Sequence, residues 1–395
     1  MQNQASRGGQ LDVYCYRFIA KKRPIVAAAF APTDRLHWVG MLPPTGKAYA
    51  EAQSRAEEAL LTATRKPRLR WLFEARRALL AAQYDATRQF FENRSGAVAV
   101  TWNGLVSDRR IFMLAARDAG AKTLFLERGP FPQTLTADPV GVNHNNGLPR
   151  DGETFRQWLS ARPDASGAWR PLADRLKQRP PRVTRESDLS KLPPLDAPFI
   201  FVPLQKQSDT QLRLFGIECR GVAETIALLA AAAPSLPNGW HIRFKEHPSD
   251  TNRAESVLRR YEGLPLYVDN STDTFAQVRA ARLVVTVNSS VGLEAMLLEK
   301  LVVAMGLAFW AIPGLAEPVT SAEALRSVFA APDRIGFDPE LRDAFLSYLA
   351  ADYYIGTETS SDGHFHIPEA DWQRVRRRVL AGQLDLSGTA YGGTR

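Results

Sequence analysis

The stretch LVVTVNSSVGLEAMLLEK, residues 283–300, joins a strand, a tight turn and the start of a helix. Its valine-rich apolar run stops at Asn288, and an amphipathic run begins a few residues later. Serine and asparagine are favourable helix caps. A helix N-terminus also presents free N–H groups and a partial positive charge, which attract anions. The turn at Asn288, Ser289, Ser290 and Gly292 is therefore either a plain cap or an anion-binding turn.

The helix after this turn carries Glu294, which we expect within the first helical turn. A carboxylate in that position complements the positive end of the helix. Alternatively, it accepts hydrogen bonds from the ribose of a ligand whose phosphate lies at the turn. The residue types fit both interpretations.

Strand-like and helix-like segments alternate on both sides of this stretch. In the first half, strands are predicted at 12–20, 24–30, 97–104 and 122–129, and helices at 49–64, 71–91 and 109–120. In the second half, strands are predicted at 199–205, 241–248, 283–287 and 301–306, and helices at 221–234, 274–282 and 294–300. Such alternation predicts an α/β protein whose parallel sheets are covered on both faces. Ligands of such sheets bind beyond the carboxyl ends of the strands.

The length of 395 residues suits two domains, and the proline-containing segment 178–198 is the best linker candidate. We expect two doubly wound, Rossmann-like domains that face a central cleft, at 1–185 and 186–345. Residues 346–395 are expected to form a helical tail.

The chain has 50 basic and 42 acidic residues, a formal charge of +8, with basic clusters at 65–77, 170–185 and 374–378. This balance suits an anionic ligand or an anionic membrane surface, or else solvated helix faces. Aromatic residues do not interleave with the basic ones, so no nucleic acid is expected as a partner. Two distant cysteines exclude a disulfide framework and favour the cytoplasm. No apolar run is long enough to span a bilayer, so any membrane contact is expected to be peripheral.

The segment HIRFKEHP, residues 241–248, places cationic side chains on one face of a strand. Because side chains alternate along a strand, Arg243, Lys245 and His247 point opposite to the apolar residues between them. An ammonium group and an imidazole N–H at the carboxyl end of a strand suit a phosphate. The alternative is a solvated edge strand.

The segment ERGPFPQTLTADPVGVNHNN, residues 127–146, is dense in glycine and proline and predicts a shaped loop. It carries two carboxylates, Glu127 and Asp138. A carboxylate pair is what glycosyl chemistry uses, one as acid or base and one as nucleophile. The alternative for Asp138 is a turn residue before Pro139.

Several familiar motifs are missing from the sequence. There is no Walker-type glycine–lysine loop, no G-x-G-x-x-G after the first strand and no D-x-D pair. His364 and His366 in GHFHIP form a weak pair that fits a strand better than a metal site. No metal or other cofactor is therefore expected, and cationic side chains with a helix N-terminus would neutralise a ligand phosphate.

Together these segments resemble the bacterial capsule polysaccharide synthesis family of retaining β-Kdo transferases. The matching stretches are FIFVPLQKQSDTQ at 199–211, KEHP at 245–248, the long run at 284–315, ERGPFPQTLTADPVGVN at 127–143 and WNGLVSDRRIFMLAARDAG at 102–120. The chain departs from the expected pattern at Glu246, where a smaller or apolar residue was expected, and around Gly129.

The resemblance implies a GT-B-like glycosyltransferase with an acceptor-side first domain and a CMP-sugar-binding second domain. The donor would be CMP-Kdo, an activated acidic eight-carbon sugar, and the acceptor a lipid-linked or other glycan of capsule or lipopolysaccharide. The enzyme would be cytoplasmic and peripheral to the inner face of the cytoplasmic membrane, with the cluster at 374–378 as one possible contact with anionic lipid.

The resemblance also implies roles for individual residues. The donor would be held by Gln205, Lys245, His247, Asn288, Ser289, Ser290 and Gly292, with Glu294 on the ribose. Transfer would be a retaining double displacement with Asp138 as nucleophile and Glu127 as candidate acid or base. Arg109, Arg110 or Arg128 would take the carboxylate of the sugar. Two alternatives stay open: a transferase with another CMP- or CDP-activated donor, and a non-catalytic partner in capsule assembly.

Overall fold

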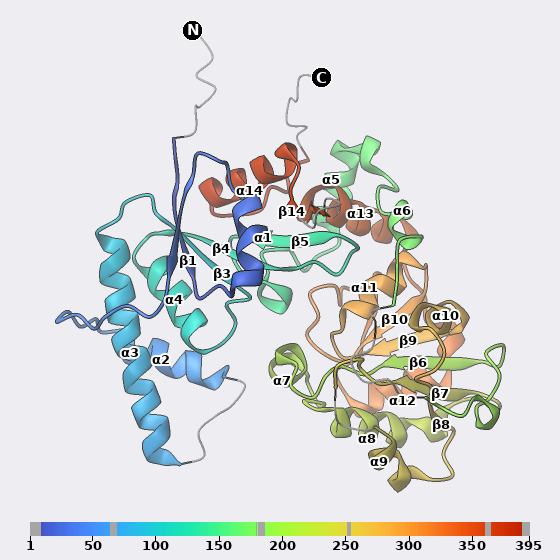
Figure 1. The fold of residues 1–395 in the computed structure, drawn as a ribbon. Coiled ribbons are helices and arrows are strands. Elements are labelled where there is room, and N and C mark those ends of the chain that lie inside the picture. The colour runs from blue at the N-terminus through green and yellow to red at the C-terminus, as the bar shows by residue number, and fades with distance from the viewer. Residues whose placement is uncertain are drawn as a thin grey trace. The chain divides into compact units, whose positions relative to one another are not determined.

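The computed structural model describes residues 9–63, 69–178, 180, 186–250, 254–359 and 365–388. The chain divides into two compact units (Figure 1). Unit 1 comprises Met1–Gly129, Gln133–Gly147 and Tyr353–Asp385, and unit 2 comprises Pro130–Pro132, Leu148–Asp352 and Leu386–Arg395. Each unit contains one six-stranded sheet.

The sheet of unit 1 has the strand order β12-β5-β4-β3-β1-β2. Its strands are β1 (Asp12–Tyr16), β2 (Arg35–Val39), β3 (Val98–Trp102), β4 (Lys122–Arg128), β5 (Thr134–Asp138) and β12 (Tyr354–Gly356). The first four are parallel, whereas β5 runs antiparallel to β4 and β12 antiparallel to β5. The strand order changes direction between β1 and β3, so their carboxyl ends form a switch point of the kind where ligands bind.

Helices cover both faces of this sheet. One layer contains α2 (Ala52–Leu61), α3 (Arg70–Glu92) and α4 (Ser107–Asp118), and the other contains α1 (Arg23–Ala28) and α14 (Glu369–Ala381). Alternate residues such as Val13, Val98 and Leu124 pack with Val26 of α1 and Val375 of α14 in one buried cluster. The remaining elements of unit 1 are two short helices, Ala20–Lys22 and Asn143–Asn145, and a hairpin of β13 (Glu358–Thr359) and β14 (Phe365–His366).

The sheet of unit 2 is wholly parallel, with the order β11-β10-β9-β6-β7-β8. Its strands are β6 (Phe199–Pro203), β7 (His241–Lys245), β8 (Leu266–Val268), β9 (Leu283–Thr286), β10 (Leu301–Ala304) and β11 (Glu317–Pro318). Along the chain this is the 3-2-1-4-5-6 order of a Rossmann fold, whose switch point lies between the first and fourth strands, here β6 and β9. Both strands are fully buried, as parallel strands with two covered faces should be.

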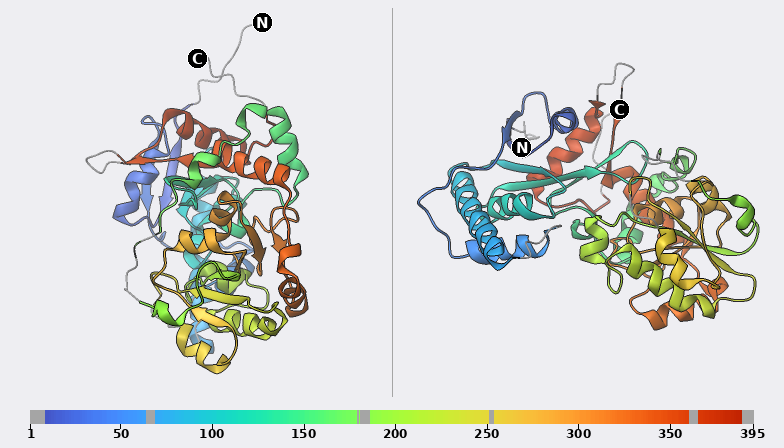
Figure 2. Two further views of the ribbon diagram at one scale, coloured as in Figure 1. Left: turned by 90° about the vertical axis from the view of Figure 1, so that its right-hand side faces the viewer. Right: turned by 60° about the horizontal axis from the view of Figure 1, so that its bottom comes forward.

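The apolar faces of this sheet are covered by helices on each side (Figure 2). Ile242, Phe244 and Val285 belong to one buried cluster with α8 (Val222–Ala232) and α12 (Ala322–Ala330). The opposite face carries α10 (Thr274–Ala280) and α11 (Ser290–Leu297). The remaining helices are α5 (Glu153–Ala161), α6 (Arg170–Ala173), α7 (Thr210–Phe215), α9 (Ala254–Leu258) and α13 (Pro339–Tyr348), with short turns at Pro163–Ala165, Leu189–Lys191, Ala233–Ser235, Arg259–Tyr261, Pro332–Arg334 and Leu349–Tyr353.

Two local predictions differ from the structure. Residues 24–30, expected as a strand, lie largely in α1, because Pro24 occupies the start of a helix where its missing N–H costs nothing. The expected loop at 127–146 begins as a β-hairpin, with β4 extending to Arg128 and pairing antiparallel with β5. The glycines and prolines of this segment hid the β-favouring run Thr134–Asp138.

The division of the chain also differs from the expected boundaries at 185, 345 and 395. Residues 148–185 group with unit 2 rather than with the first domain, because α5 packs on α13. Of the expected tail 346–395, Tyr353–Asp385 belongs to unit 1, to which it supplies β12 and α14. Figure 2 shows the red α14 lying on the strands of unit 1.

Candidate functional site

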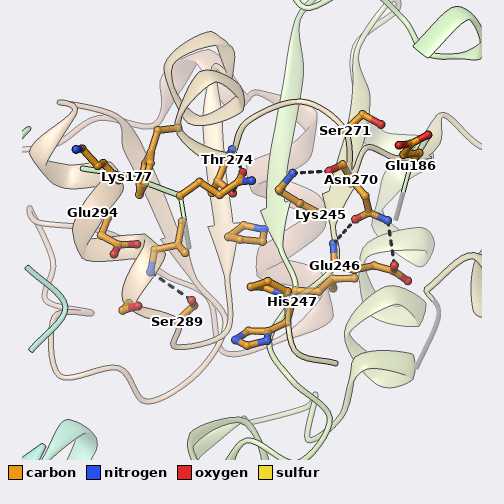
Figure 3. A pocket seen from close by; sticks show the side chains of 17 residues that line it. Lys177, Glu186, Lys245, Glu246, His247, Asn270, Ser271, Thr274, Ser289 and Glu294 are labelled. Atoms are coloured by element: carbon orange, nitrogen blue, oxygen red, sulfur yellow. Dashed lines mark hydrogen bonds between the residues drawn. The ribbon is translucent and has the colours of Figure 1, made fainter. Parts of the chain in front are cut away.

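Unit 2 contains a pocket of about 530 Å³ at the carboxyl edge of its sheet. Its walls come from the ends of β6, β7 and β8, from the N-terminus of α11 and from Lys177, Gln178 and Glu186 (Figure 3). This is the edge at which the strand order reverses, where Rossmann folds bind their ligands. Of the residues predicted to bind the donor, Lys245, His247, Ser289, Ser290 and Glu294 line this one pocket.

Lys245 ends β7 and reaches the pocket from a buried position. Its ammonium group donates to the carbonyl oxygens of Asn270 at 3.0 Å and Thr272 at 2.6 Å. Burial lowers its pKa, while the carboxylates of Asp269 and Asp273 favour the charged form. An ammonium group makes three hydrogen bonds, so a third can go to a ligand. The side-chain faces predicted for this strand are confirmed, but β7 is an interior strand and not the solvated edge strand considered as the alternative.

Glu246, the departure noted in the sequence, has a structural explanation. Its carboxylate accepts a hydrogen bond from Asn270 Nδ2 at 3.0 Å and another from the backbone N–H of Ala254. Its own backbone N–H donates to Asn270 Oδ1 at 3.0 Å. Glu246 thus fixes the loop that carries Asn270 against the start of α9, and Asn270 in turn positions Lys245.

His247 follows two residues after the strand and lines the pocket. Its Nδ1 accepts a hydrogen bond from the backbone N–H of Ser249 at 3.1 Å. In a neutral imidazole that bond leaves the proton on Nε2, which is then a donor. An imidazole N–H of this kind is a donor that suits an anion.

The turn before α11 is a capped helix start. Ser289 is the N-cap, and its Oγ accepts from the backbone N–H of Val291 at 3.2 Å. The backbone N–H of Ser290, the first helical residue, has no intrahelical acceptor by geometry, and Ser290 lines the pocket. Both interpretations of the turn are compatible with this structure, because capping and anion binding use different N–H groups.

Gly292, predicted to bind the donor, does not line the pocket. A Cβ at this position would come within 2.4 Å of the Trp310 ring, so glycine is needed for the close packing of α11 on that side chain. Overpacking of this kind costs about 1–3 kcal/mol.

Gln205 and Asn288, also predicted to bind the donor, instead hold each other. Gln205 Nε2 donates to Asn288 Oδ1 at 2.9 Å, and the backbone N–H of Asn288 donates to Gln205 Oε1 at 3.1 Å. Asn288 Nδ2 also donates to the carbonyl oxygen of Gln211 at 2.9 Å. These hydrogen bonds link the loop after β6 to the loop after β9 and thereby hold the turn in place.

The sequence predicts Glu294 within the first turn of the helix. In the structure it is the fifth residue of α11 and lies beyond that turn. A carboxylate stabilises the positive end of a helix only from within the first turn. The interpretation of Glu294 as a group that complements the helix terminus is therefore not supported. Figure 3 shows its carboxylate at one side of the pocket, near Lys177. At this position the Glu294 carboxylate is suited to accept hydrogen bonds from hydroxyl groups of a ligand.

Lys177 and Gln178 line the pocket but were not selected from the sequence, where this part of the chain was interpreted as linker and solvated basic surface. Gln178 Oε1 accepts hydrogen bonds from the backbone N–H of Thr274 at 2.6 Å and from its hydroxyl at 2.8 Å. Ser187 is bonded to the same loop, through Asn270 and Ser271. The expected linker thus forms a wall of the pocket. Residues 179 and 181–185 lie outside the described part of the chain.

Unit 1 gathers a second polar cluster at the carboxyl ends of β3 and β4. The half-buried carboxylate of Glu127 accepts hydrogen bonds from Trp102 Nε1 at 2.7 Å and from Asn103 Nδ2 at 2.8 Å. The backbone N–H of Arg128 donates to the same group at 3.0 Å. Asn103 has a positive φ of 70°, which turns its side chain back to Glu127. Glu127 is therefore oriented and still accessible.

Lys22 lies close enough to interact electrostatically with Glu127, Arg109 and Arg128. Lys22 places its Nζ 3.6 Å from the centre of the Trp102 ring, a cation–π contact. Burial lowers the pKa of Lys22 to about 8, with Arg109 and Arg128 adding to the lowering and Glu127 opposing it. Arg110, the third arginine suggested for the sugar carboxylate, instead pairs with Glu58. Lys22, which the sequence did not single out, takes its place in the cluster.

Asp138, predicted as nucleophile, is fully buried at the end of β5. Its carboxylate accepts four hydrogen bonds, from the backbone N–H groups of Val140 at 2.7 Å, Gly141 at 3.1 Å and Gly147 at 2.9 Å, and from the Tyr353 hydroxyl at 3.1 Å. Burial raises its pKa, while these donors oppose the rise. This geometry matches the structural turn role considered as the alternative for Asp138, because four donors of the protein occupy the carboxylate.

Within the described residues, no group of three or more His, Cys, Asp or Glu side chains is placed to hold a metal ion. His366 is in β14, and its predicted partner His364 lies outside the described residues. A search of the described helices for one long and apolar enough to cross a bilayer finds none.

Comparison with known proteins agrees with this architecture. Residues 173–358 match the model of a family described as capsule polysaccharide biosynthesis protein. Protein FixF of Sinorhizobium fredii (strain NBRC 101917 / NGR234) is 33% identical over 261 residues, which are 65% of this chain and 60% of that protein. The chain thus spans less than two thirds of this relative.

The structure of Thermosulfurimonas dismutans KpsC, described as a beta Kdo 2,7 transferase, superimposes with a TM-score of 0.53 at 17% identity. The match covers 93% of this chain and 99% of that chain. The chain is thus an α/β protein with a GT-B-like pair of Rossmann-like units. The match of residues 173–358 to the capsule polysaccharide biosynthesis model agrees with the resemblance seen in the sequence, and the predicted fold class is confirmed.

Proposed function

We propose that the protein is a retaining glycosyltransferase that transfers Kdo from CMP-Kdo to a lipid-linked or other glycan in capsule or lipopolysaccharide synthesis. The observation that carries the proposal is that Lys245, His247 and the start of α11 line one pocket at the switch point of a Rossmann-like sheet. An ammonium group, an imidazole N–H and the backbone N–H of Ser290 together match a monophosphate. The family and the KpsC-like fold add support.

In this proposal the pocket of unit 2 holds CMP. Lys245, His247 and the backbone N–H of Ser290 bind the phosphate, and Glu294 accepts hydrogen bonds from the ribose. Gln205, Asn288 and Gly292 shape the turn from behind and do not touch the donor. A monophosphate leaving group carries less charge than a diphosphate, so these groups can stabilise it without a metal ion.

We assign the nucleophile to Glu127 instead of Asp138, because Glu127 is the accessible and oriented carboxylate of the two. In the first step its oxygen bonds to the anomeric carbon while the bond from that carbon to the phosphate oxygen breaks, and the electron pair leaves with CMP. In the second step the oxygen of an acceptor hydroxyl bonds to the anomeric carbon and displaces Glu127. The proton of that hydroxyl goes to the phosphate of the bound CMP. Lys22, Arg109 and Arg128 bind the carboxylate of the acidic sugar.

The direct test is incubation of the full chain with CMP-Kdo and a panel of lipid-linked and free glycans. We expect CMP release with transfer, and a peptide containing Glu127 that gains the mass of one Kdo when the acceptor is withheld. No CMP release and no transfer across the whole panel would sink the proposal. A larger thermal shift with CDP-glycerol than with CMP-Kdo would favour the alternative donor. A chain that binds nucleotide but transfers nothing would favour the non-catalytic assembly partner.

A further inference from the structure

The basic cluster at 374–378, expected as the contact with anionic lipid, is largely engaged inside unit 1. Arg374 pairs with Asp371, and Arg376 pairs with Asp34 at 2.8 Å. Arg378 is buried and donates to two backbone carbonyls. Arg376 and Arg378 hold α14 on unit 1, and Arg374 is paired within the helix, so this cluster is not a free basic surface.

A different surface combines charge with exposed apolar side chains. Helix α3 is 23 residues long, yet its buried residues all lie from Leu80 onward. Its first three turns, Arg70 to Leu79, contain none. In Figure 1 these turns extend beyond α2 and past the edge of the sheet of unit 1.

The outward side of these turns is apolar. Trp71 is 65% exposed, Leu79 50%, and Leu69, just before the helix, 55%. At about 100° per residue, Trp71, Leu72, Ala75, Ala78 and Leu79 fall within an arc of about 120°. All five are exposed. We call these five residues the α3 stripe.

The opposite side of the same turns faces unit 1. Phe73 packs against the buried cluster of α2, α3 and α4, and Arg76 Nη2 donates to Ser107 Oγ at 3.0 Å. The helix therefore has two apolar sides, only one of which its own unit uses. Exposed apolar residues clustered in this way mark an interaction surface, whereas single ones need no explanation.

The charges that flank the stripe in the sequence indicate its partner. Arg70 is exposed, and Arg77 forms its ion pair with Glu74 on the same helix. Residues 61–79 hold six basic side chains and one acidic one: Arg65, Lys66, Arg68, Arg70, Arg76 and Arg77 against Glu74. The first three of these lie outside the described residues. Basic residues around an apolar helix face that carries tryptophan are typical of helices that lie in the interface of an anionic bilayer.

We propose that the α3 stripe docks the protein on an anionic membrane, with Trp71, Leu72 and Leu79 entering the headgroup region. The tryptophan ring suits the boundary between headgroups and acyl chains, since it has an apolar body and a polar N–H. Three helical turns give a shallow, reversible contact, and the basic residues add attraction to anionic lipid. This goes beyond glycosyl transfer, because it names the surface on which the chain meets its membrane.

The test is sedimentation of the full chain with vesicles of phosphatidylcholine containing 30 mol% phosphatidylglycerol, roughly a physiological share of anionic lipid. We expect binding that weakens as salt rises. The double variant Trp71→Ser/Leu79→Ser should weaken binding at least tenfold, to anionic and neutral vesicles alike. Arg70→Gln should weaken it about fivefold, on anionic vesicles only.

Leu189→Ser is the matched control, because Leu189 is 55% exposed but belongs to unit 2. It should bind vesicles like the unaltered chain. Absence of binding to anionic vesicles, or equal losses in the control and the double variant, would overturn the proposal. It also fails if the chain is a dimer in solution that the double variant dissociates, since the stripe would then face a second copy. These measurements use no donor or acceptor, so their failure leaves the proposed transfer reaction intact.

Discussion

The carboxyl edges of the two sheets follow the same topological rule but carry opposite chemistry. In unit 2, the carboxyl ends of β6, β7 and β9 collect an ammonium group, an imidazole and the start of a helix. In unit 1, the ends of β3 and β4 collect a carboxylate fixed by Trp102 and Asn103, with cations around it. The first set suits a phosphate that leaves, and the second suits a sugar that reacts.

This difference implies that donor binding and chemistry can be separated by mutation. Changes at the unit 2 edge should weaken CMP binding, and changes at the unit 1 edge should slow transfer with CMP binding intact. Four substitutions or pH measurements test that separation.

The largest effect is expected for Glu127→Gln. The amide keeps the shape and the contact with Asn103 but cannot form the bond to the anomeric carbon, so transfer should fall by at least about 10³-fold. The thermal shift produced by CMP should stay unchanged. Transfer within tenfold of the unaltered enzyme would remove Glu127 from the chemistry and break the comparison.

Next is Lys245→Met, which removes the ammonium group from the phosphate pocket. A charge-assisted hydrogen bond contributes about 1.5–3 kcal/mol, so the Kd for CMP should rise about 10- to 150-fold by calorimetry. The carbonyl oxygens of Asn270 and Thr272 also lose a donor, so the melting temperature must be measured alongside. Ser290→Ala, which keeps the backbone N–H that binds the phosphate, is the control and should leave the Kd within about threefold.

A third substitution, Asp138→Asn, distinguishes the two carboxylates of unit 1. One carboxylate oxygen becomes an amide NH₂ group that faces backbone N–H donors. The free energy of unfolding measured in urea should therefore fall by about 1–3 kcal/mol. The folded fraction should keep transfer within about tenfold. If the variant is instead as stable as the unaltered protein but inactive, Asp138 is the nucleophile after all.

The smallest effect is a pH dependence at Lys22. Burial lowers the pKa of this lysine to about 8, well below the pKa of an ordinary lysine. Its positive charge is therefore lost as the pH rises through that value. The KM for the acidic sugar should therefore rise above pH 8. Lys22→Arg keeps the charge at high pH and should flatten the profile. A profile with the same rise in Lys22→Arg would assign the titration to another group.

Sequence patterns predicted the parts of the site that depend on local structure. The strand ending at Lys245 and the cap at Ser289 follow from alternation and capping, and both reach the pocket where topology places strand ends. Predictions were weaker wherever distant segments decide a role. Gln205 and Asn288 have ligand-like side chains, but each is used by the other across two loops.

The same limit explains the residues that were missed. Lys177 lies in a stretch whose composition is that of a linker, and only its neighbours' hydrogen bonds to Thr274 and Asn270 bring it to the pocket. Lys22 has no motif around it and becomes notable through the Trp102 ring beneath it. Asp138 matched the pattern of a reactive carboxylate. Its carboxylate is nevertheless occupied by backbone N–H groups, whose positions cannot be predicted from the residue types.

Gly292 ties the identity of one residue to another far along the chain. With a Cβ at 292 placed 2.4 Å from the Trp310 ring, the two positions form a size-matched pair. Alanine at 292 alone should be poorly tolerated, whereas alanine at 292 together with leucine at 310 should recover much of the loss. A relative that accepts a larger residue at the first position is therefore expected to carry a smaller one at the second, and its α11 would begin at a slightly different depth. The width of the unit 2 pocket would thus differ between relatives without any change in the residues that line it.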